Sequence, residues 1–186
     1  MTPALEAAYA EPHRRYHGRA HIEACLRELA AVPDLSERDR RLLNWAIWWH
    51  DAVYDPRRAD NEDVSAELAR RDLAAMGADK ADIDEVARLI LLTKGHAVAQ
   101  GDRLGALLVS IDLSILGADT TAYDAYVAGV RHEYGHVPED AFRAGRARVM
   151  RHFLEAPVLY ADPTFRDRLE VQARANIARE IAGLEA

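Results

Sequence analysis

The chain has 186 residues, 49% of them hydrophobic, and a formal net charge of -7 at neutral pH. This length suits one domain with a sizeable core, and the composition excludes general disorder. The negative charge argues against a protein that binds nucleic acid polymers, but it leaves room for a local basic pocket for one phosphate group.

The single cysteine, Cys25, excludes an intrachain disulfide and a zinc site built from several cysteines. The N-terminal residues lack the apolar core of a signal peptide, and the longest apolar runs, RLILLT and ALLVSIDLSILG, are too short to span a bilayer. We therefore expect a cytoplasmic protein that does not enter the membrane.

Apolar residues recur three and four positions apart almost throughout the chain, which is typical of amphipathic helices. Pro3 opens the first predicted helix, and Ser36 caps the third. Gly77, Gly95 and Gly117 follow predicted helix ends. The predicted helices cover residues 3–11, 16–31, 36–53, 61–77, 79–94, 102–116, 119–135, 138–156 and 164–184.

The pattern shows no alternating strand and no internal repeat. It predicts an all-α fold, a compact single-domain helical bundle over residues 1–186 with short loops. The remaining question is why several ionisable side chains fall where this pattern predicts a helix interior.

The first such group is the pair His17 and His21, four residues apart and therefore on one helical face. This spacing suits two ligands of one metal ion. Taken alone, however, the pair favours the simpler interpretation of two polar residues at a helix edge.

The second group is the doublet His50–Asp51, which lies in the apolar segment NWAIWWHDAVY with all three tryptophans. An ionised carboxylate in such surroundings needs a partner. Adjacent helical residues point about 100° apart, so the two side chains can reach one ion from neighbouring directions. The alternative is a histidine bonded to a backbone carbonyl, with Asp51 turned to water at a helix end.

The third is Asp112, which lies among leucine, isoleucine and valine in ALLVSIDLSILG. So apolar a helix is buried over most of its circumference. A carboxylate there needs a cation or several hydrogen bonds, and either a metal or an arginine can satisfy it.

The acidic loop after the doublet is the fourth feature, and most of it suits solvent or a helix cap at Asn61. Asp55 differs because it lies four residues beyond Asp51, near the same helical face. Together the four features supply His, His, Asp and Asp from three helices. Such donors suit divalent ions, which lower the pKa of a bound water and polarise a phosphoryl oxygen.

In this order, His21, then His50–Asp51, then Asp112, the chain resembles the HD superfamily of metal-dependent phosphohydrolases. It is most similar to a bacterial subgroup of predicted metal-dependent HD phosphohydrolases. The phrases that carry this likeness span nearly the whole chain: YHGRAHI, WWHDAVYDP, DNEDVSAE, DLSILG, GRARVMRHFLEAPVLY and EVQARANIARE.

The resemblance implies that His21, His50, Asp51 and Asp112 hold one divalent ion, with Mn, Co, Ni, Fe, Zn and Mg as candidates. It also implies an acidic residue after the doublet that orients or deprotonates the attacking water, and the candidates are Asp55 and Glu62. Other branches place a Glu three residues after the doublet, where this chain has Tyr54.

A phosphohydrolase also needs basic groups for the charge on the phosphoryl oxygens. The candidates for binding a small phosphorylated substrate are Arg14, His17, Lys94 and His96, although each taken singly suits a solvated surface position. A nucleotide is among the candidate substrates, because tryptophan can stack on a base.

Two other functions stay open. One is an HD-type oxygenase with two irons. The resemblance implies extra histidines between the doublet and the last aspartate for a second metal, and this chain has only His96 there. The other is a non-catalytic module that binds a metal or nucleotide for regulation, against which stands the complete set of four ligands. Towards the C-terminus, we expect the stripe of Arg146, Arg148 and Arg151 to be mainly solvated, with Arg146 a candidate for a position in a pocket.

Overall fold

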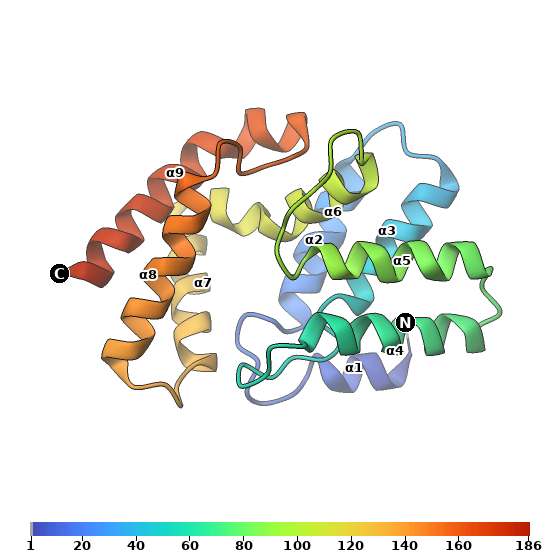
Figure 1. The fold of residues 1–186 in the computed structure, drawn as a ribbon, viewed down its shortest axis with the longest axis horizontal. Helices are drawn as coiled ribbons and strands as arrows, with labels where there is room; N and C mark the ends of the chain where they lie inside the picture. Colours follow the sequence, from blue (N-terminus) through green and yellow to red (C-terminus); the bar gives the residue numbers. More distant parts are fainter. Residues whose placement is uncertain (1) are drawn as a thin grey trace. The chain divides into compact units, whose positions relative to one another are not determined.

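Helices form all the regular structure of the part of the chain that is described, residues 2–186 of a computed structural model (Figure 1). These residues contain no strand, which confirms the all-α prediction. The helices are α1 (Pro3–Ala8), α2 (Arg19–Ala31), α3 (Glu37–Trp49), α4 (Asn61–Ala75), α5 (Lys80–Leu92), α6 (Arg103–Asp112), the 3₁₀ helix η1 (Leu113–Gly117), α7 (Thr120–Glu133), α8 (Glu139–Glu155) and α9 (Pro163–Glu185).

The chain divides after Asp112 into two compact units, and each is described by itself. The first unit contains α1 to α6, and the second contains η1 and α7 to α9. The prediction of a single domain over residues 1–186 stays a prediction.

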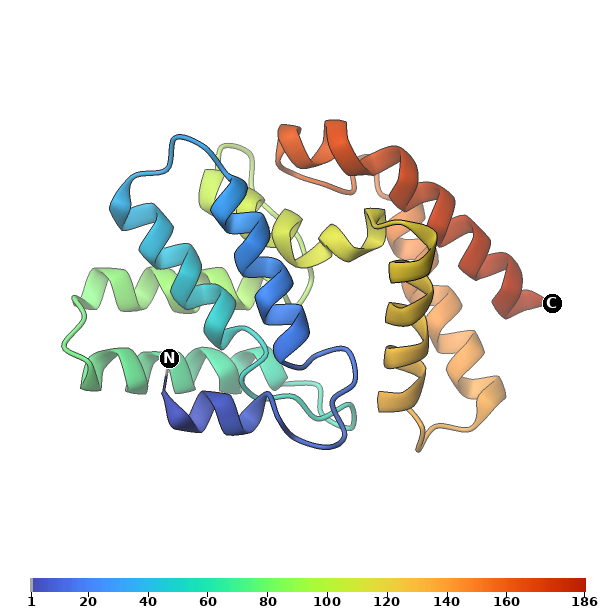
Figure 2. The same cartoon turned by 180° about the vertical axis from the view of Figure 1, so that it is seen from behind.

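In the first unit, α3 lies at the centre and packs against α2, α4, α5 and α6. Helices α4 and α5 lie side by side, as both ribbon views show (Figures 1 and 2). The side of α3 that faces its neighbours is apolar because Leu42, Leu43, Ala46, Ile47 and Trp49 recur at helical spacing. Their burial fixes α3 in the core of this unit, and His50 and Asp51 follow directly at its C-terminal end.

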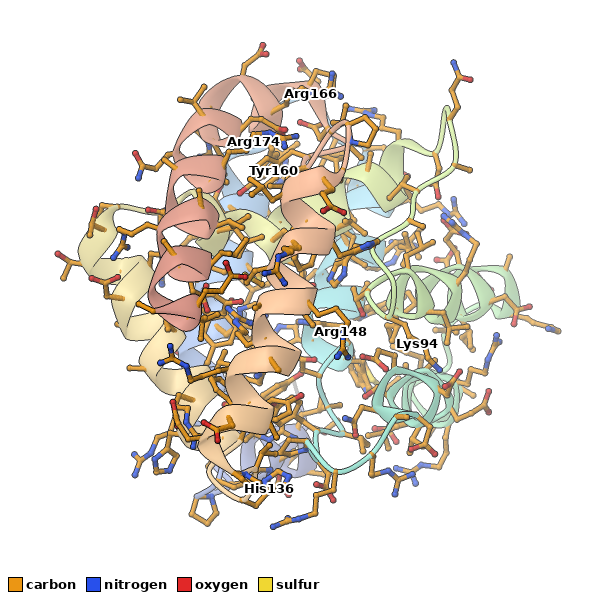
Figure 3. All side chains as sticks on the ribbon, turned by 60° about the vertical axis from the view of Figure 1, so that its left-hand side comes forward. Lys94, His136, Arg148, Tyr160, Arg166 and Arg174 are labelled. Atoms are coloured by element: carbon orange, nitrogen blue, oxygen red, sulfur yellow. The ribbon has the colours of Figure 1, made fainter. Side chains whose placement is uncertain are left out.

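The second unit is built around α9, which packs against α8 and η1. Gly117 allows the close approach of η1, because a Cβ atom there would lie only 2.6 Å from the Cβ of Leu169. Near the start of α9, Arg166 donates to the Tyr160 carbonyl at 3.2 Å, and both side chains are visible beside Arg174 in Figure 3.

Two of the differences between predicted and observed helix ends concern the candidate site. The helix expected over residues 36–53 stops at Trp49, and His50 becomes its C-cap. The helix expected over residues 102–116 changes to 3₁₀ geometry directly after Asp112. Both changes fall at predicted site residues.

Within residues 2–186, no single helix has the length and apolar character to cross a membrane. The bent pair formed by residues 103–117 and 120–133 meets those two criteria only when its halves are taken together.

Candidate metal centre

Four ionisable side chains of the first unit converge on one buried point. His21 projects from α2, His50 caps the end of α3, Asp51 follows it, and Asp112 is the last residue of α6. His21 and His50 are 6% and 3% exposed, so the centre is closed to bulk water over most of its surface. The structure therefore brings together the four residues predicted as metal ligands.

The donor atoms lie at distances that suit one ion. His21 Nε2 is 3.2 Å from His50 Nε2 and 3.2 Å from Asp112 Oδ1. His50 Nε2 is 3.1 Å from Asp51 Oδ2. Bonds of about 2.1 Å to an ion place neighbouring donors about 3.0 Å apart at a right angle and about 3.4 Å apart at a tetrahedral angle. These three separations match that range, whereas the 3.5 Å from His50 Nε2 to Asp112 Oδ1 and the 3.7 Å from His21 Nε2 to Asp51 Oδ2 correspond to wider angles at the ion.

The backbone fixes the orientation of the His50 ring. Its Nδ1 lies 2.9 Å from the carbonyl oxygen of Ile47. Because a carbonyl oxygen only accepts, Nδ1 carries the proton, and Nε2 points into the cluster. Metal-binding histidines are commonly oriented in this way by a hydrogen bond from the other ring nitrogen.

Asp51 supplies the most telling atom of the centre. Its Oδ2 is buried and has no partner with hydrogen-bond geometry among residues 2–186, although it lies 3.1 Å from His50 Nε2. A buried carboxylate oxygen without a partner costs free energy. A cation bound between Asp51 and the two imidazoles would remove that cost, so the residues present fit a metal ion.

The charges of the cluster point the same way. Burial alone would raise the pKa of Asp51, but the facing His50 outweighs it and holds that pKa below the ordinary value. Burial would also raise the pKa of Asp112. The contacts with His21, His50 and His96 outweigh this effect and lower that pKa well below its ordinary value. Burial acts to lower the pKa of His50, yet Asp51 and Asp112 raise it well above its usual value. The two carboxylates thus favour a positive charge at His50, and a divalent cation would supply such a charge.

A fifth ionisable residue, His96, contacts this centre from the loop after α5. Its Nε2 lies 3.3 Å from Asp112 Oδ2, the carboxylate oxygen that His21 does not contact. The ring is 24% exposed, so it connects the buried cluster with solvent. Of the four predicted substrate-binding residues, His96 places its side chain against the carboxylate of a predicted ligand.

No family model, curated protein or solved structure matches this chain. The geometry of the centre is thus the main ground for any statement about function.

Arg14 holds the turn that carries the doublet. Its guanidinium donates to the carbonyl oxygens of Asp51 at 2.6 Å, Ala52 at 3.1 Å and His17 at 3.0 Å. Its Nε donates to Glu11 at 2.9 Å. The side chain is buried, and these bonds satisfy carbonyl groups in the turn after α3 and in the segment before α2. The structure thus gives Arg14 a positioning role, and substrate binding by it stays a prediction.

Ser65 ties down the same turn from α4. The Val53 N–H donates to Ser65 Oγ at 3.0 Å, and Oγ lies 3.3 Å from the Val53 carbonyl oxygen. Together with Arg14, this contact explains why α3 ends before Asp51 although the apolar pattern continues.

His17 lies beside the centre in an aromatic group. Its ring stacks on Tyr54 with 4.2 Å between centroids, and it lies 6.2 Å from the ring of His21. Lys94 instead donates to Asp63 at 2.6 Å. Hence His17 lies near the centre, as predicted for a substrate-binding residue, whereas Lys94 pairs with a carboxylate of α4.

The two predicted catalytic acids follow the doublet in sequence. Asp55 is 44% exposed at its side chain, and its Oδ1 accepts from the Arg57 N–H at 2.9 Å. Glu62 is partly buried in the first turn of α4. No distance places either carboxylate among the four converging donors, and their catalytic roles stay predictions.

Cys25 is a member of this region that the sequence analysis did not consider. It lies one helical turn after His21, is 2% exposed, and its Sγ is 3.7 Å from His21 Nε2. Burial, together with the nearby Asp112, raises the pKa of the thiol. The signal was its spacing of four residues from His21, which places both on one helical face.

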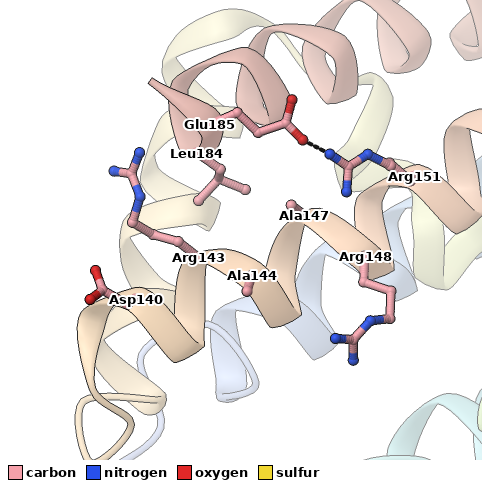
Figure 4. Close-up of a pocket in the computed structure, with 8 residues that line it drawn as sticks. All are labelled: Asp140, Arg143, Ala144, Ala147, Arg148, Arg151, Leu184 and Glu185. Atoms are coloured by element: carbon pink, nitrogen blue, oxygen red, sulfur yellow. Dashed lines mark ion pairs between the residues drawn. The ribbon is translucent and has the colours of Figure 1, made fainter.

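The second unit contains a separate polar group and a hollow. Arg146 donates to Glu180 at 2.7 Å, and its side chain is 10% exposed. Arg146, which the sequence set apart from the solvated part of the stripe, is therefore buried, and Glu180 compensates its charge. Arg148 and Arg151 line a hollow of about 460 Å³ between α8 and the end of α9, where Arg151 pairs with Glu185 (Figure 4).

Proposed function

We propose that this protein is a metal-dependent phosphohydrolase of the HD type that cleaves a small phosphate ester. The observation that carries the proposal is the convergence of His21, His50, Asp51 and Asp112, whose donor atoms contact one another at 3.1–3.2 Å, together with an Asp51 oxygen that has no hydrogen-bond partner. The order of these residues in the chain, which resembles the HD pattern, adds support. Two imidazoles and two carboxylates suit one divalent ion such as Mn, Co, Ni, Fe, Zn or Mg.

A divalent ion held there would polarise a phosphoryl oxygen and lower the pKa of a water molecule. The protein's own contribution is to present the four donors from its helices, and Arg14 and Ser65 secure the turn at residues 51–53 that carries Asp51. Because the imidazoles are buried, the donors need little reorganisation when the ion binds.

His96 and His17 are the candidates for contact with the phosphate, because they lie nearest the predicted ligands. Lys94 would need to leave Asp63 to take part. Asp55 or Glu62 would accept the proton of the attacking water, as the resemblance implies. The stacked rings of His17 and Tyr54 offer an aromatic face that suits a nucleotide base.

The decisive experiment combines metal analysis with hydrolysis. Purified protein, stripped and reloaded with each candidate ion, is assayed on p-nitrophenyl phosphate, bis-p-nitrophenyl phosphate and nucleoside monophosphates. We expect one ion per chain and metal-dependent phosphate release. Asp112→Asn should lose both, with hydrolysis reduced at least about 100-fold. The matched control is Asp167→Asn, because Asp167 is an exposed aspartate on α9.

Ester hydrolysis that survives Asp112→Asn unchanged would remove the proposal, as would a fully loaded protein that is inert on every ester. The contact of His96 with the outer oxygen of Asp112 favours the oxygenase as the second candidate, because it offers a further nitrogen donor beside the first site. Two irons per chain together with dioxygen consumption would select that alternative. Metal binding without any turnover would favour the regulatory module.

A further inference from the structure

The thiol of Cys25 faces the polar centre and not only the apolar core. Its Sγ lies 3.7 Å from His21 Nε2 and 3.8 Å from His21 Nδ1. The donor atoms of His21, Cys25 and Asp112 all lie within 4.8 Å of one another. The group His21, His50 and Asp51 meets the same criterion, so the two groups share His21.

The spacing between sulfur and nitrogen suits two ligands of one ion. Bonds of about 2.1 Å to nitrogen and about 2.3 Å to sulfur give a separation of about 3.6 Å at a tetrahedral angle. The distance of 3.7 Å between Sγ and His21 Nε2 agrees with that value. In the group that shares His21, Asp51 Oδ2 has no hydrogen-bond partner, and this independently marks the shared centre as one that a cation would complete.

We propose that Cys25 is a further ligand of the metal centre, and that its thiolate makes the centre prefer thiophilic ions such as Zn, Co and Cd over Mg and Mn. This inference rests on the metal centre of the proposed function. When the sulfur–metal bond forms, the Sγ–H bond breaks and its proton passes to solvent, without a change in the oxidation state of sulfur.

The physical reason for the preference is ligand softness. Thiolate sulfur binds polarisable ions more strongly than hard ions, whereas carboxylate oxygen is preferred by Mg and Mn. Without Cys25 the donors are two imidazoles and two carboxylates, which discriminate less between these classes. We therefore expect the sulfur to strengthen the binding of Zn much more than the binding of Mn.

Cobalt spectroscopy tests this directly, because Cys25 is the only cysteine in the chain. The full chain is titrated with Co²⁺, and its absorption is recorded in the visible and the near ultraviolet. We expect visible ligand-field bands together with a near-ultraviolet thiolate-to-cobalt band. In Cys25→Ser and Cys25→Ala the thiolate band should vanish while the visible bands persist.

A second readout is the ratio of affinities measured by equilibrium dialysis. Cys25→Ser should weaken Zn²⁺ binding at least about tenfold and leave Mn²⁺ binding within about threefold. Equal changes for the two ions would overturn the proposal.

If the variants fail to fold, the cobalt spectrum of the wild type still tests the proposal, because the thiolate-to-cobalt band is either present or absent in it. Visible bands without a thiolate band would overturn the role of Cys25 and leave the metal centre intact. If no cobalt bands appear at all, both the ligand role of Cys25 and the metal-dependent function fail. Metal binding with the thiolate band, but without ester hydrolysis, would contradict only the proposed reaction.

Discussion

Asp112 is contacted at both of its carboxylate oxygens, and His96 holds the outer one. His96 Nε2 lies 3.3 Å from Asp112 Oδ2, while Asp112 Oδ1 lies 3.2 Å from His21 Nε2. His96 reaches this position from a left-handed backbone conformation with φ +54°. That conformation costs a residue with a Cβ about 1–2 kcal/mol. A strained backbone at this point suggests that its position is needed for function.

Substitution of His96 should separate the backbone strain from the side-chain contact. Asn adopts the left-handed region readily, whereas a β-branched residue does not. His96→Val should therefore be less stable than His96→Asn by about 1–2 kcal/mol in chemical denaturation. The control is the same pair of substitutions at His136, which is exposed and has a negative φ. An equal difference at both positions would contradict the assignment of strain.

Metal binding should stabilise the protein through Asp51. An ion that binds only the folded state at a concentration of about 100 times its Kd adds about 2.7 kcal/mol to the free energy of unfolding. We expect Mn²⁺ or Co²⁺ to raise the unfolding temperature of the wild type but not of Asp51→Asn, in which the orphan oxygen loses its charge. Differential scanning fluorimetry with and without a chelator measures this. A metal-dependent rise retained in Asp51→Asn would exclude Asp51 as a ligand.

Arg14 should contribute strongly to stability. Its removal leaves the carbonyl groups of Asp51, Ala52 and His17 without a buried donor. We expect Arg14→Ala to lower the free energy of unfolding by about 2–4 kcal/mol, measured by urea denaturation. Arg14→Lys should recover less than half of the loss, because an ammonium cannot reproduce the planar set of donors.

The control for this series is Arg27→Ala, at an exposed position of α2. It should change stability by no more than about 0.5 kcal/mol. A small loss in Arg14→Ala, comparable with that of the control, would show that the turn at residues 51–53 holds without the clamp.

The helices could be predicted from the sequence because their signals are local. Ser36 caps α3 through a bond to the Asp39 N–H at 3.0 Å, as the pattern indicated. The end of α3 was placed four residues too late, since the apolar pattern continues past Trp49. The non-helical turn after Trp49 is held by Arg14, which lies 37 residues before Asp51, and by Ser65, so these contacts leave no signal in the local apolar pattern.

The candidate centre was predictable for a different reason: a charged residue in an apolar helix needs a partner, whichever fold it adopts. That principle identified Asp51 and Asp112. It did not distinguish a buried arginine from a solvated one, so Arg14 was assigned to substrate, and the internal ion pair of Arg146 with Glu180 was not foreseen. Cys25 was missed because a single cysteine was weighed only against sites built from several, although its spacing from His21 was visible in the sequence.

Asp82 offers a test of pH-dependent stability in the first unit, away from the centre. Arg38 Nη2 lies 2.7 Å from Asp82 Oδ1, and Arg41 donates to Oδ2 at 2.8 Å, so the pair joins α5 to α3. The hydrogen bonds from Arg41 and Arg38 lower the pKa of Asp82 and outweigh its partial burial. The carboxylate form is thus favoured in the folded state.

The sign of the pH dependence follows from that direction. Because the folded state binds the proton less tightly than the unfolded chain, the stabilisation is complete above the unfolded pKa of about 3.9. It is lost as the pH falls below that value through the lowered pKa of the folded state. Asp82→Asn should be less stable than the wild type by about 1–2 kcal/mol at pH 7, a modest value because both arginines are half-exposed.

Urea denaturation between pH 7 and pH 3 measures the difference between the wild type and Asp82→Asn. We expect the difference to be constant from pH 7 to about pH 5 and to shrink as the pH approaches 3, since the wild type then loses the charge that the variant lacks. Asp167→Asn, on the exposed face of α9, should show no such convergence. A difference that stays constant down to pH 3 would mean that Asp82 contributes through packing and hydrogen bonds alone, and that the two arginines do not favour its charged form.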